Sequence, residues 1–350
     1  MMKRARKTRG RRNESKYLMA LAAACLAFST SAFSTEGHFD RILPVAGPVE
    51  VAVRTGAGTL TVSAGDESSV HVHATIRAWG GLFSGEEAEK RIHYLETHPP
   101  LEQHGDTITL GAITEPSLQH NISISYDLVV PAATRLKSKT GSGDQTIRGI
   151  SGPLEVSTGS GNIRASNIGS NVQVSTGSGE IDLESVQGKV RASSGSGGIR
   201  AFGIAGSFRA STGSGDVTLE QMAVADAHAS SASGNIALKN VRGLLHAKTA
   251  AGSISAEGGG REPWRLETVS GSIGIRVPLD LGFDLHAHSV SGSISTTRPL
   301  TLQGTVHHRE ITGKAGNGGF LLDVSTVSGN VHIDWLALPK PLSLREKAEL

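Results

Sequence analysis

The chain has 350 residues, of which 37% are hydrophobic and only 4% aromatic, and its formal net charge at pH 7 is +2. Its single cysteine, Cys25, excludes a framework of internal disulfides. So small a net charge gives no electrostatic reason to expect nucleic acid as a partner.

The first 34 residues have the organisation of a secretory signal peptide. Basic residues come first, an apolar stretch follows from Tyr17 to Phe28, and small residues lead to Ser34. Removing the eight basic residues and the one acidic residue of this segment changes the net charge from +2 to about −5. Leu21–Cys25 also resembles a lipoprotein box. Cys25 is therefore either lipidated or removed with the peptide. Lipidation at Cys25 is the only membrane attachment that we expect. We therefore expect an extracytoplasmic protein, in the periplasm, at the cell surface or secreted.

Residues 35–136 are predicted to form a β-rich cap that contains one short helix. The helix is expected over residues 84–98, where Ala88, Ile92 and Leu95 share one face. Strand-like sequence is present at 49–53, 69–73, 107–110 and 122–130. We expect this region to cover the open edge of the domain that follows, and residues 336–350 to form a C-terminal tail.

Residues 137–335 repeat a glycine-rich turn at nearly constant spacing. Its second glycine recurs at Gly143, Gly161, Gly179, Gly197, Gly215, Gly234, Gly252, Gly271 and Gly292, with a further copy at Gly329 after an insertion. A short run of alternating apolar and polar residues lies on each side of the turn, such as 154–156 before Gly161 and 163–165 after it. A period of about 18 residues therefore predicts one coil of an all-β solenoid, wound right-handed, whose stacked coils bury a continuous core.

Two passages carry a resemblance to a known family. The sequence YDLVVPAATRLKSKTGSGD (Tyr126–Asp144), followed by serial TGSG units, and the earlier VRTGAGTLTV (Val53–Val62) are similar to a bacterial adhesin family of β-strand-repeat proteins, largely of unknown function. The resemblance covers about residues 40–335. It implies the repeat fold and a role in adhesion, and it supplies no catalytic residues.

One outward position of the repeat forms a column of Arg and His. The middle residues of successive strands are Glu155, Gln173, Arg191, Arg209, His228, His246, Arg265 and His286. Stacked coils would place these side chains about 4.8 Å apart. Arg suits planar carboxylate and phosphate groups, and the histidines gain charge near or below about pH 6.5. We expect the last six of these residues to bind an anionic polysaccharide, lipid headgroup or envelope polymer; the alternative is a solvated strand face whose charges neighbouring acids balance.

The sequence gives little reason to expect catalysis, a metal or a cofactor. The pairs His71/His73 and His286/His288 lack a third ligand at a telling spacing, and the glycine turns lack the P-loop ending. No serine lies in a nucleophile motif. The prediction is a secreted, non-enzymatic binding or structural protein. Two alternatives stay open: an envelope scaffold or sensing subunit that binds a protein partner by an edge or cap, and a polysaccharide-active enzyme.

Overall fold

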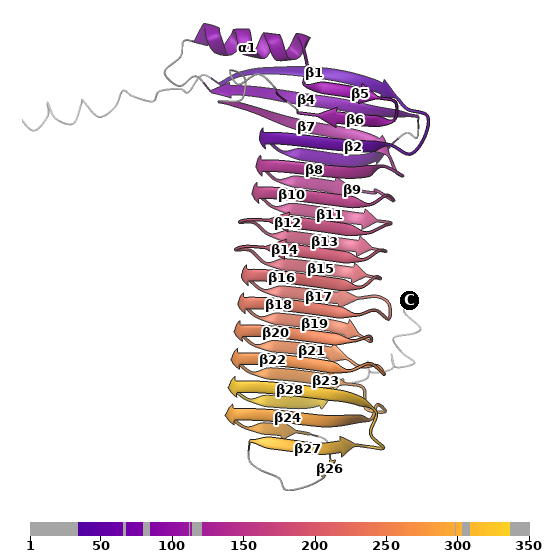
Figure 1. Cartoon of the computed structure of the whole chain (residues 1–350), viewed down its shortest axis with the longest axis vertical. Coiled ribbons are helices and arrows are strands. Elements are labelled where there is room, and N and C mark those ends of the chain that lie inside the picture. The colour runs from indigo at the N-terminus through magenta and orange to yellow at the C-terminus, as the bar shows by residue number, and fades with distance from the viewer. Residues whose placement is uncertain are drawn as a thin grey trace, which may run out of the picture.

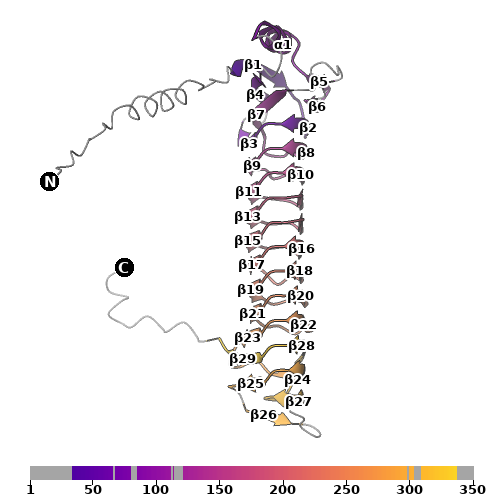
Figure 2. The ribbon, with the colours of Figure 1, turned by 90° about the vertical axis from the view of Figure 1, so that its left-hand side faces the viewer.

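A computed structural model describes residues 34–65, 68–79, 85–111, 113, 121–297, 299–302 and 309–336. The described part of the chain is a long stack of short strands, with helix α1 (Gly85–Thr97) at the N-terminal end of the stack (Figure 1). The edge-on view in Figure 2 shows two layers of strands along almost the whole stack. The segment 1–33 with Cys25 and the tail beyond Leu336 lie outside the described residues.

The two layers are a 14-stranded sheet, here called sheet A, and a 15-stranded sheet, here called sheet B. Sheet A has the spatial order β1 (Ser34–Pro44), β4 (Ser69–Trp79), β7 (Ile122–Pro131), β3 (Leu60–Gly65), β9 (Gln145–Arg148), β11 (Ile163–Ile168), β13 (Ile181–Val186), β15 (Ile199–Ile204), β17 (Val217–Gln221), β19 (Ile236–Val241), β21 (Ile254–Gly258), β23 (Ile273–Val277), β29 (Val331–Trp335) and β25 (Ile294–Thr296). Sheet B has the order β26 (Leu300–Leu302), β27 (Glu310–Ala315), β24 (Phe283–Ser291), β28 (Phe320–Ser328), β22 (Trp264–Ser270), β20 (Leu245–Ala251), β18 (Ala227–Ser233), β16 (Phe208–Ser214), β14 (Val190–Ser194), β12 (Val172–Thr176), β10 (Leu154–Ser160), β8 (Arg135–Ser142), β2 (Glu50–Ala57), β6 (Thr107–Leu110) and β5 (Leu101–His104).

Each coil contributes one strand to each sheet, and successive coils pair in parallel. Leu154 of β10 pairs with Val172 of β12, and Val172 with Val190 of β14, so the register advances by 18 residues per coil. The predicted all-β solenoid is confirmed. A crossover of this length through the opposite sheet is what allows neighbouring strands to run in parallel.

The core is a narrow apolar seam between the two sheets. Alternate residues point inward, so Ile163 and Ala165 of β11 are buried whereas Arg164 between them is exposed. Small branched side chains fill most of the seam, and Trp264 is the bulkiest of its fully buried members. No single coil could exclude water from such a seam, so stability depends on stacking.

The glycine-rich corner joins neighbouring coils by two devices. From Gly161 to Gly271, a buried hydroxyl three residues before each marker glycine donates to the carbonyl of the preceding marker, as Thr176 does to Gly161 (2.9 Å) and Thr212 to Gly197 (2.9 Å). The marker glycines themselves approach so closely that a Cβ at Gly179 would clash with the carbonyl oxygen of Gly161. Packing between coils therefore requires glycine at the corner, because a side chain there would clash with the neighbouring coil.

The N-terminal cap covers one edge of sheet A. Strands β1, β4 and β7 pair antiparallel, and helix α1 (Gly85–Thr97) packs on β1 and β4. The helix was expected over 84–98, and its predicted apolar face is buried. Glu96 Oε1 accepts the backbone N–H of His38 on the edge strand β1 (3.1 Å). This contact satisfies a donor that would otherwise be open to another strand.

The first coil of the stack comes from residues that the sequence pattern assigned to the cap. Val51 of β2 pairs with Leu136 of β8, and Val62 of β3 pairs with Ile147 of β9, in the register of the later coils. The turn between β2 and β3 carries the same Thr-Gly-x-Gly pattern as the repeats. Residues 68–131 are therefore an insertion between the first and second coils.

The last coils are stacked out of chain order. Strand β28 lies between β22 and β24 (Figure 1), and β29 lies between β23 and β25 (Figure 2). The copy of the turn at Gly329 therefore stacks directly on Gly271, although the sequence spacing places Gly292 there. The long connection through β26 and β27 makes this order possible, because it lets the chain pass the end coil and return.

Candidate binding surface

The predicted Arg and His column exists on sheet B, with one correction at its C-terminal end. Pairing in register joins Glu155, Gln173, Arg191, Arg209, His228, His246 and Arg265 on successive strands. The next position belongs to Asp323 of β28, and His286 of β24 follows it. Arg265 and His286 are therefore not neighbours as predicted, because β28 is inserted between their strands.

The inserted carboxylate changes the chemistry of that end. Asp323 accepts a hydrogen bond from Arg265 Nε (3.0 Å) and lies 3.4 Å from His286 Nδ1. Glu310 on β27 lies 3.5 Å from the other ring nitrogen of His286. These two predicted binding residues thus already have anionic partners within the fold.

The middle of the column is different. Arg191, Arg209, His228 and His246 lie on four successive strands, and we call these residues the basic stripe. None of the four has an ion-pair partner in the part of the chain that the structure describes. Both arginines are exposed. Their guanidinium groups are therefore available to an external anion.

The two histidines lie beside each other, with their rings tilted by 60°, at the end of the basic stripe. Their ring centroids are 6.1 Å apart, and Nε2 of His246 is buried without a hydrogen-bond partner among the described residues. Partial burial lowers the pKa of His228, and the neighbouring charges of Arg209 and His246 lower it further, against an opposing effect of Asp226. The lowered pKa favours the uncharged form of His228 at neutral pH.

A column of small hydroxyl groups runs beside the basic stripe. Ser193, Ser211 and Ser230 are paired in register two residues after the stripe on successive strands and are exposed. A carbonyl accepts a weak bond from Ser230 (Ala210 O, 3.4 Å). Hydroxyls next to arginines provide both donors and acceptors for a polar ligand.

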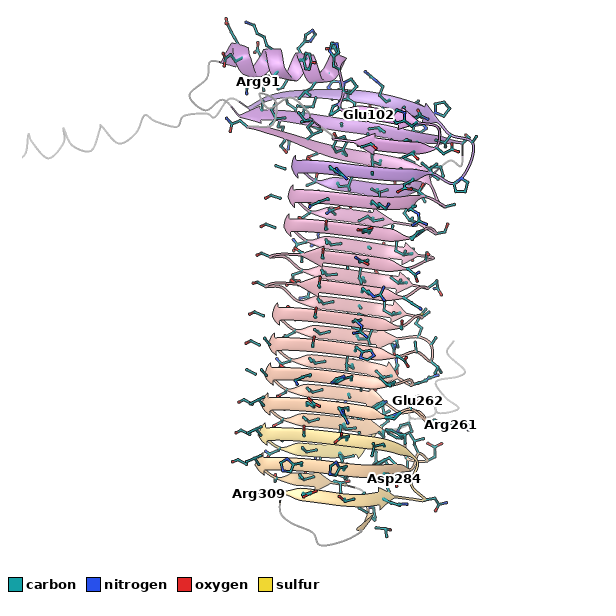
Figure 3. The ribbon with its side chains drawn as sticks, viewed as in Figure 1. Arg91, Glu102, Arg261, Glu262, Asp284 and Arg309 are labelled. Carbon is teal, nitrogen blue, oxygen red and sulfur yellow. The ribbon has the colours of Figure 1, made fainter. Side chains whose placement is uncertain are left out.

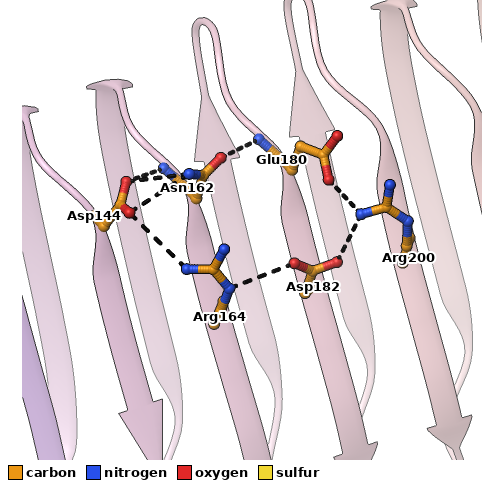
Figure 4. A network of polar contacts seen from close by, with 6 residues as sticks. All are labelled: Asp144, Asn162, Arg164, Glu180, Asp182 and Arg200. Atoms are coloured by element: carbon orange, nitrogen blue, oxygen red, sulfur yellow. Dashed lines mark hydrogen bonds and ion pairs between the residues drawn. The ribbon is translucent and has the colours of Figure 1, made fainter.

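On the opposite face of the coils, two arginines are paired with acidic residues. On sheet A, Arg164 lies 3.9 Å from Asp144 and 3.7 Å from Asp182, and Arg200 pairs with Asp182 (3.3 Å) and with Glu180 (Figure 4). Such exposed pairs add little stability, but they compensate the charges of both Arg164 and Arg200. The two faces of the same coils thus differ in their electrostatics.

The sequence column missed further basic residues on sheet B. Lys137 of β8 occupies the column position before Glu155, and Arg135 of β8 and Lys189 just before β14 precede the column positions of their strands. All three side chains are exposed. Writing the residue before each strand in register, as well as the middle one, would have identified Lys189. Figure 3 shows polar side chains along the whole stack, including Arg261 and Glu262 in the corner loop after β21 and Asp284 near its far end.

The histidine pairs weighed as metal ligands have other contacts. His73 Nδ1 bonds Asp40 (2.6 Å), and His71 Nε2 lies 3.1 Å from the Ser69 hydroxyl. Within the described ranges, no three His, Cys, Asp or Glu side chains gather closely enough to hold a metal ion. The same ranges contain no helix with the length and apolar character needed to cross a membrane.

Comparison with curated proteins gave no match. Three solved bacterial structures are similar at 10–13% identity, each aligned over 86% of this chain. They are a putative cell adhesion protein from Clostridium sporogenes (10% identity, 100% of that chain, TM-score 0.22), a putative adhesin from Bacteroides fragilis (12%, 97%, 0.30) and a putative adhesin from Parabacteroides distasonis (13%, 97%, 0.25).

A family match covers most of the repeat region. The model of the Toastrack DUF4097 family matches residues 117–206 and 204–334, which together are more than half of the chain. The matched ranges begin just before β7 and run to β29, so they include nearly all of the coils described above. On this evidence the chain is a member of the Toastrack DUF4097 family of β-strand-repeat proteins.

Proposed function

We propose that the chain is a non-catalytic, extracytoplasmic binding protein whose basic stripe contacts an anionic polysaccharide of the envelope or its surroundings. One observation carries this proposal: Arg191 and Arg209 lie on successive strands with no acidic partner among the described residues, whereas Arg164 and Arg200 on the opposite face are paired. If both faces were only solvated surfaces, we would expect no such difference in the pairing of their arginines.

The repeat explains how weak contacts add up. Side chains on neighbouring strands are about 4.8 Å apart, which permits several of them to contact one extended polymer at once. Each exposed charge contact contributes only about 0.2–1 kcal/mol. A polymer held at several coils gains affinity through the high effective concentration of its remaining groups.

Binding of the purified protein to immobilised polygalacturonate tests the proposal, with neutral dextran as the reference polymer. The double variant Arg191→Gln/Arg209→Gln is expected to bind about twofold to thirtyfold more weakly. Its matched control is Arg164→Gln/Arg200→Gln, which removes the same number of arginines from sheet A of the neighbouring coils and should bind like the parent.

Salt provides the second readout. Binding through exposed charges should weaken as the ionic strength rises, because the Debye length falls below the distance between surface charges. Binding that survives both high salt and the loss of Arg191 and Arg209 would contradict the proposal. It would instead favour a protein partner at the cap or at a sheet edge.

A further inference from the structure

A hollow of about 190 Å³ lies in sheet B at the N-terminal end of the basic stripe. Two pairs of cations frame it. Arg135 and Lys137 of β8 form one end, and Lys189 with Arg191 of β14 form the other. All four side chains are exposed. The hollow is therefore open to solvent and bordered by positive charge at both ends.

The register of the strands gives the distance between the two pairs. Lys137, Glu155, Gln173 and Arg191 are successive partners on β8, β10, β12 and β14. Three strand spacings separate the ends, which amounts to about 14 Å between the backbones of the two cation pairs. One small anion could not contact both pairs without drawing the long side chains far inward.

The space between the cation pairs is neutral to acidic. Asn171 and Gln173 contribute amides, and Asn171 Oδ1 accepts the backbone N–H of Lys189 (2.9 Å), which leaves its NH₂ group to donate outward. Glu155 is exposed, and no ion-pair partner is recorded for it among the described residues. Its carboxylate would repel an anionic group placed at the middle of the hollow.

The two ends differ in strength. Lys137 bonds Glu50 at 2.7 Å, and this contact lowers the pKa of Glu50, so the pair stays ionised at neutral pH. Part of the positive charge at that end is thus already compensated. Lys189 and Arg191 have no such partner among the described residues, so the stronger attraction for an anion lies at the β14 end.

We propose that this hollow is a binding site for a short acidic oligosaccharide in which charged sugars are separated by neutral ones. Anionic groups would lie at the two cation pairs, and the hydroxyls of a neutral sugar would bond the amides of Asn171 and Gln173 and the carboxylate of Glu155. A chain charged on every sugar is disfavoured, because one of its carboxylates would lie against Glu155. The inference rests on the proposed function, since the hollow adjoins the same surface, but the two sites share only Arg191.

Calorimetric titration with two hexasaccharides tests the site. In a hyaluronan hexasaccharide carboxylates alternate with neutral sugars, whereas in hexagalacturonate every sugar is charged. The parent protein should prefer the former. Arg135→Gln/Lys189→Gln should weaken hyaluronan binding about fivefold. Glu155→Gln should strengthen hexagalacturonate binding about threefold and change hyaluronan binding less than twofold. Circular dichroism verifies that each variant keeps its strands.

Two results would overturn the inference: equal affinity of the parent for both hexasaccharides, or an equal effect of Glu155→Gln on both. The variant Arg209→Gln separates this site from the basic stripe, because Arg209 lies outside the hollow. One outcome is that hexasaccharide binding requires Arg135 and Lys189, while the binding of long polymers is unaffected by Arg209→Gln. That outcome would support the site in the hollow and refute binding at the basic stripe. The reverse pattern would refute the hollow alone.

Discussion

Replacing Gly179 by alanine tests whether the corner glycines are required by packing between coils. The new Cβ would clash with the carbonyl oxygen of Gly161 in the preceding coil, so the two coils must separate by about 1.4 Å to reach an ordinary contact. That movement weakens the bond from Thr176 to Gly161 (2.9 Å) and the bond from Ser178 N to Gly159 O (3.1 Å). Two weakened bonds and the overpacking together cost about 3 kcal/mol.

Urea unfolding followed by circular dichroism measures this cost, and Gly274→Ala provides the control. Gly274 lies on an outward position of β23, and a Cβ there meets nothing within 4 Å. We expect that substitution to be neutral or to stabilise by up to about 1 kcal/mol, because alanine restricts the unfolded chain more than glycine does. Equal midpoints for the two variants would refute the argument that coil contact, and not backbone freedom, selects glycine at the corner.

Two further predictions concern the coil contacts and the histidines. Thr212→Val keeps the buried shape but removes the hydroxyl that donates to Gly197, so the urea midpoint should fall by an amount equivalent to about 1–2 kcal/mol; an unchanged midpoint would show that the hydroxyl contributes nothing. The pKa of His228 is lower in the folded chain than in the unfolded chain. Just below about pH 6.5 the unfolded state therefore binds more protons than the folded state. The free energy of unfolding should fall there as the pH decreases, and should level off below the pKa of the folded state. His228→Gln should flatten this part of a thermal-stability profile against pH, and a profile identical to that of the parent would contradict the assignment.

The repeat architecture could be read from the sequence because its rules are local. A turn at constant spacing and alternation on either side determine a coil, and residues such as Ile163 and Ala165 are buried as their pattern predicts. The helix of the cap followed from the same kind of periodicity. These features need no information about distant parts of the chain.

The order of the last coils could not be read in this way. The spacing from Gly271 to Gly292 is close to one period, so the pattern treats those two turns as neighbours. Which coil stacks on which is decided by pairing between strands far apart in the chain, and the turn sequence at Gly329 is much like that at Gly292. For the same reason the acidic partner of Arg265 and His286 was missed.

The candidate surface was predicted in part. The column of Arg and His followed from the strand register, but the availability of its members did not, because that depends on acids contributed by other coils. Asp323 neutralises one end, and the carboxylates that pair with Arg164 and Arg200 lie on the other face. Sequence alone shows where a charge points, while its partners depend on the stacked neighbours.

The displaced position of β28 has a consequence for vectorial folding. A chain that emerges N-terminus first can add coils one by one as far as β22 and β23, each templated by the coil before it. Strand β24 does not pair with β22, because β28, which ends at Ser328, lies between the two strands. The stack is thus closed only after the chain has been synthesised as far as Ser328. Until β28 is available, β22 has an open edge for parallel pairing, and β28 of another molecule could pair with it equally well. Two chains could therefore exchange strands in the interval before the stack is closed.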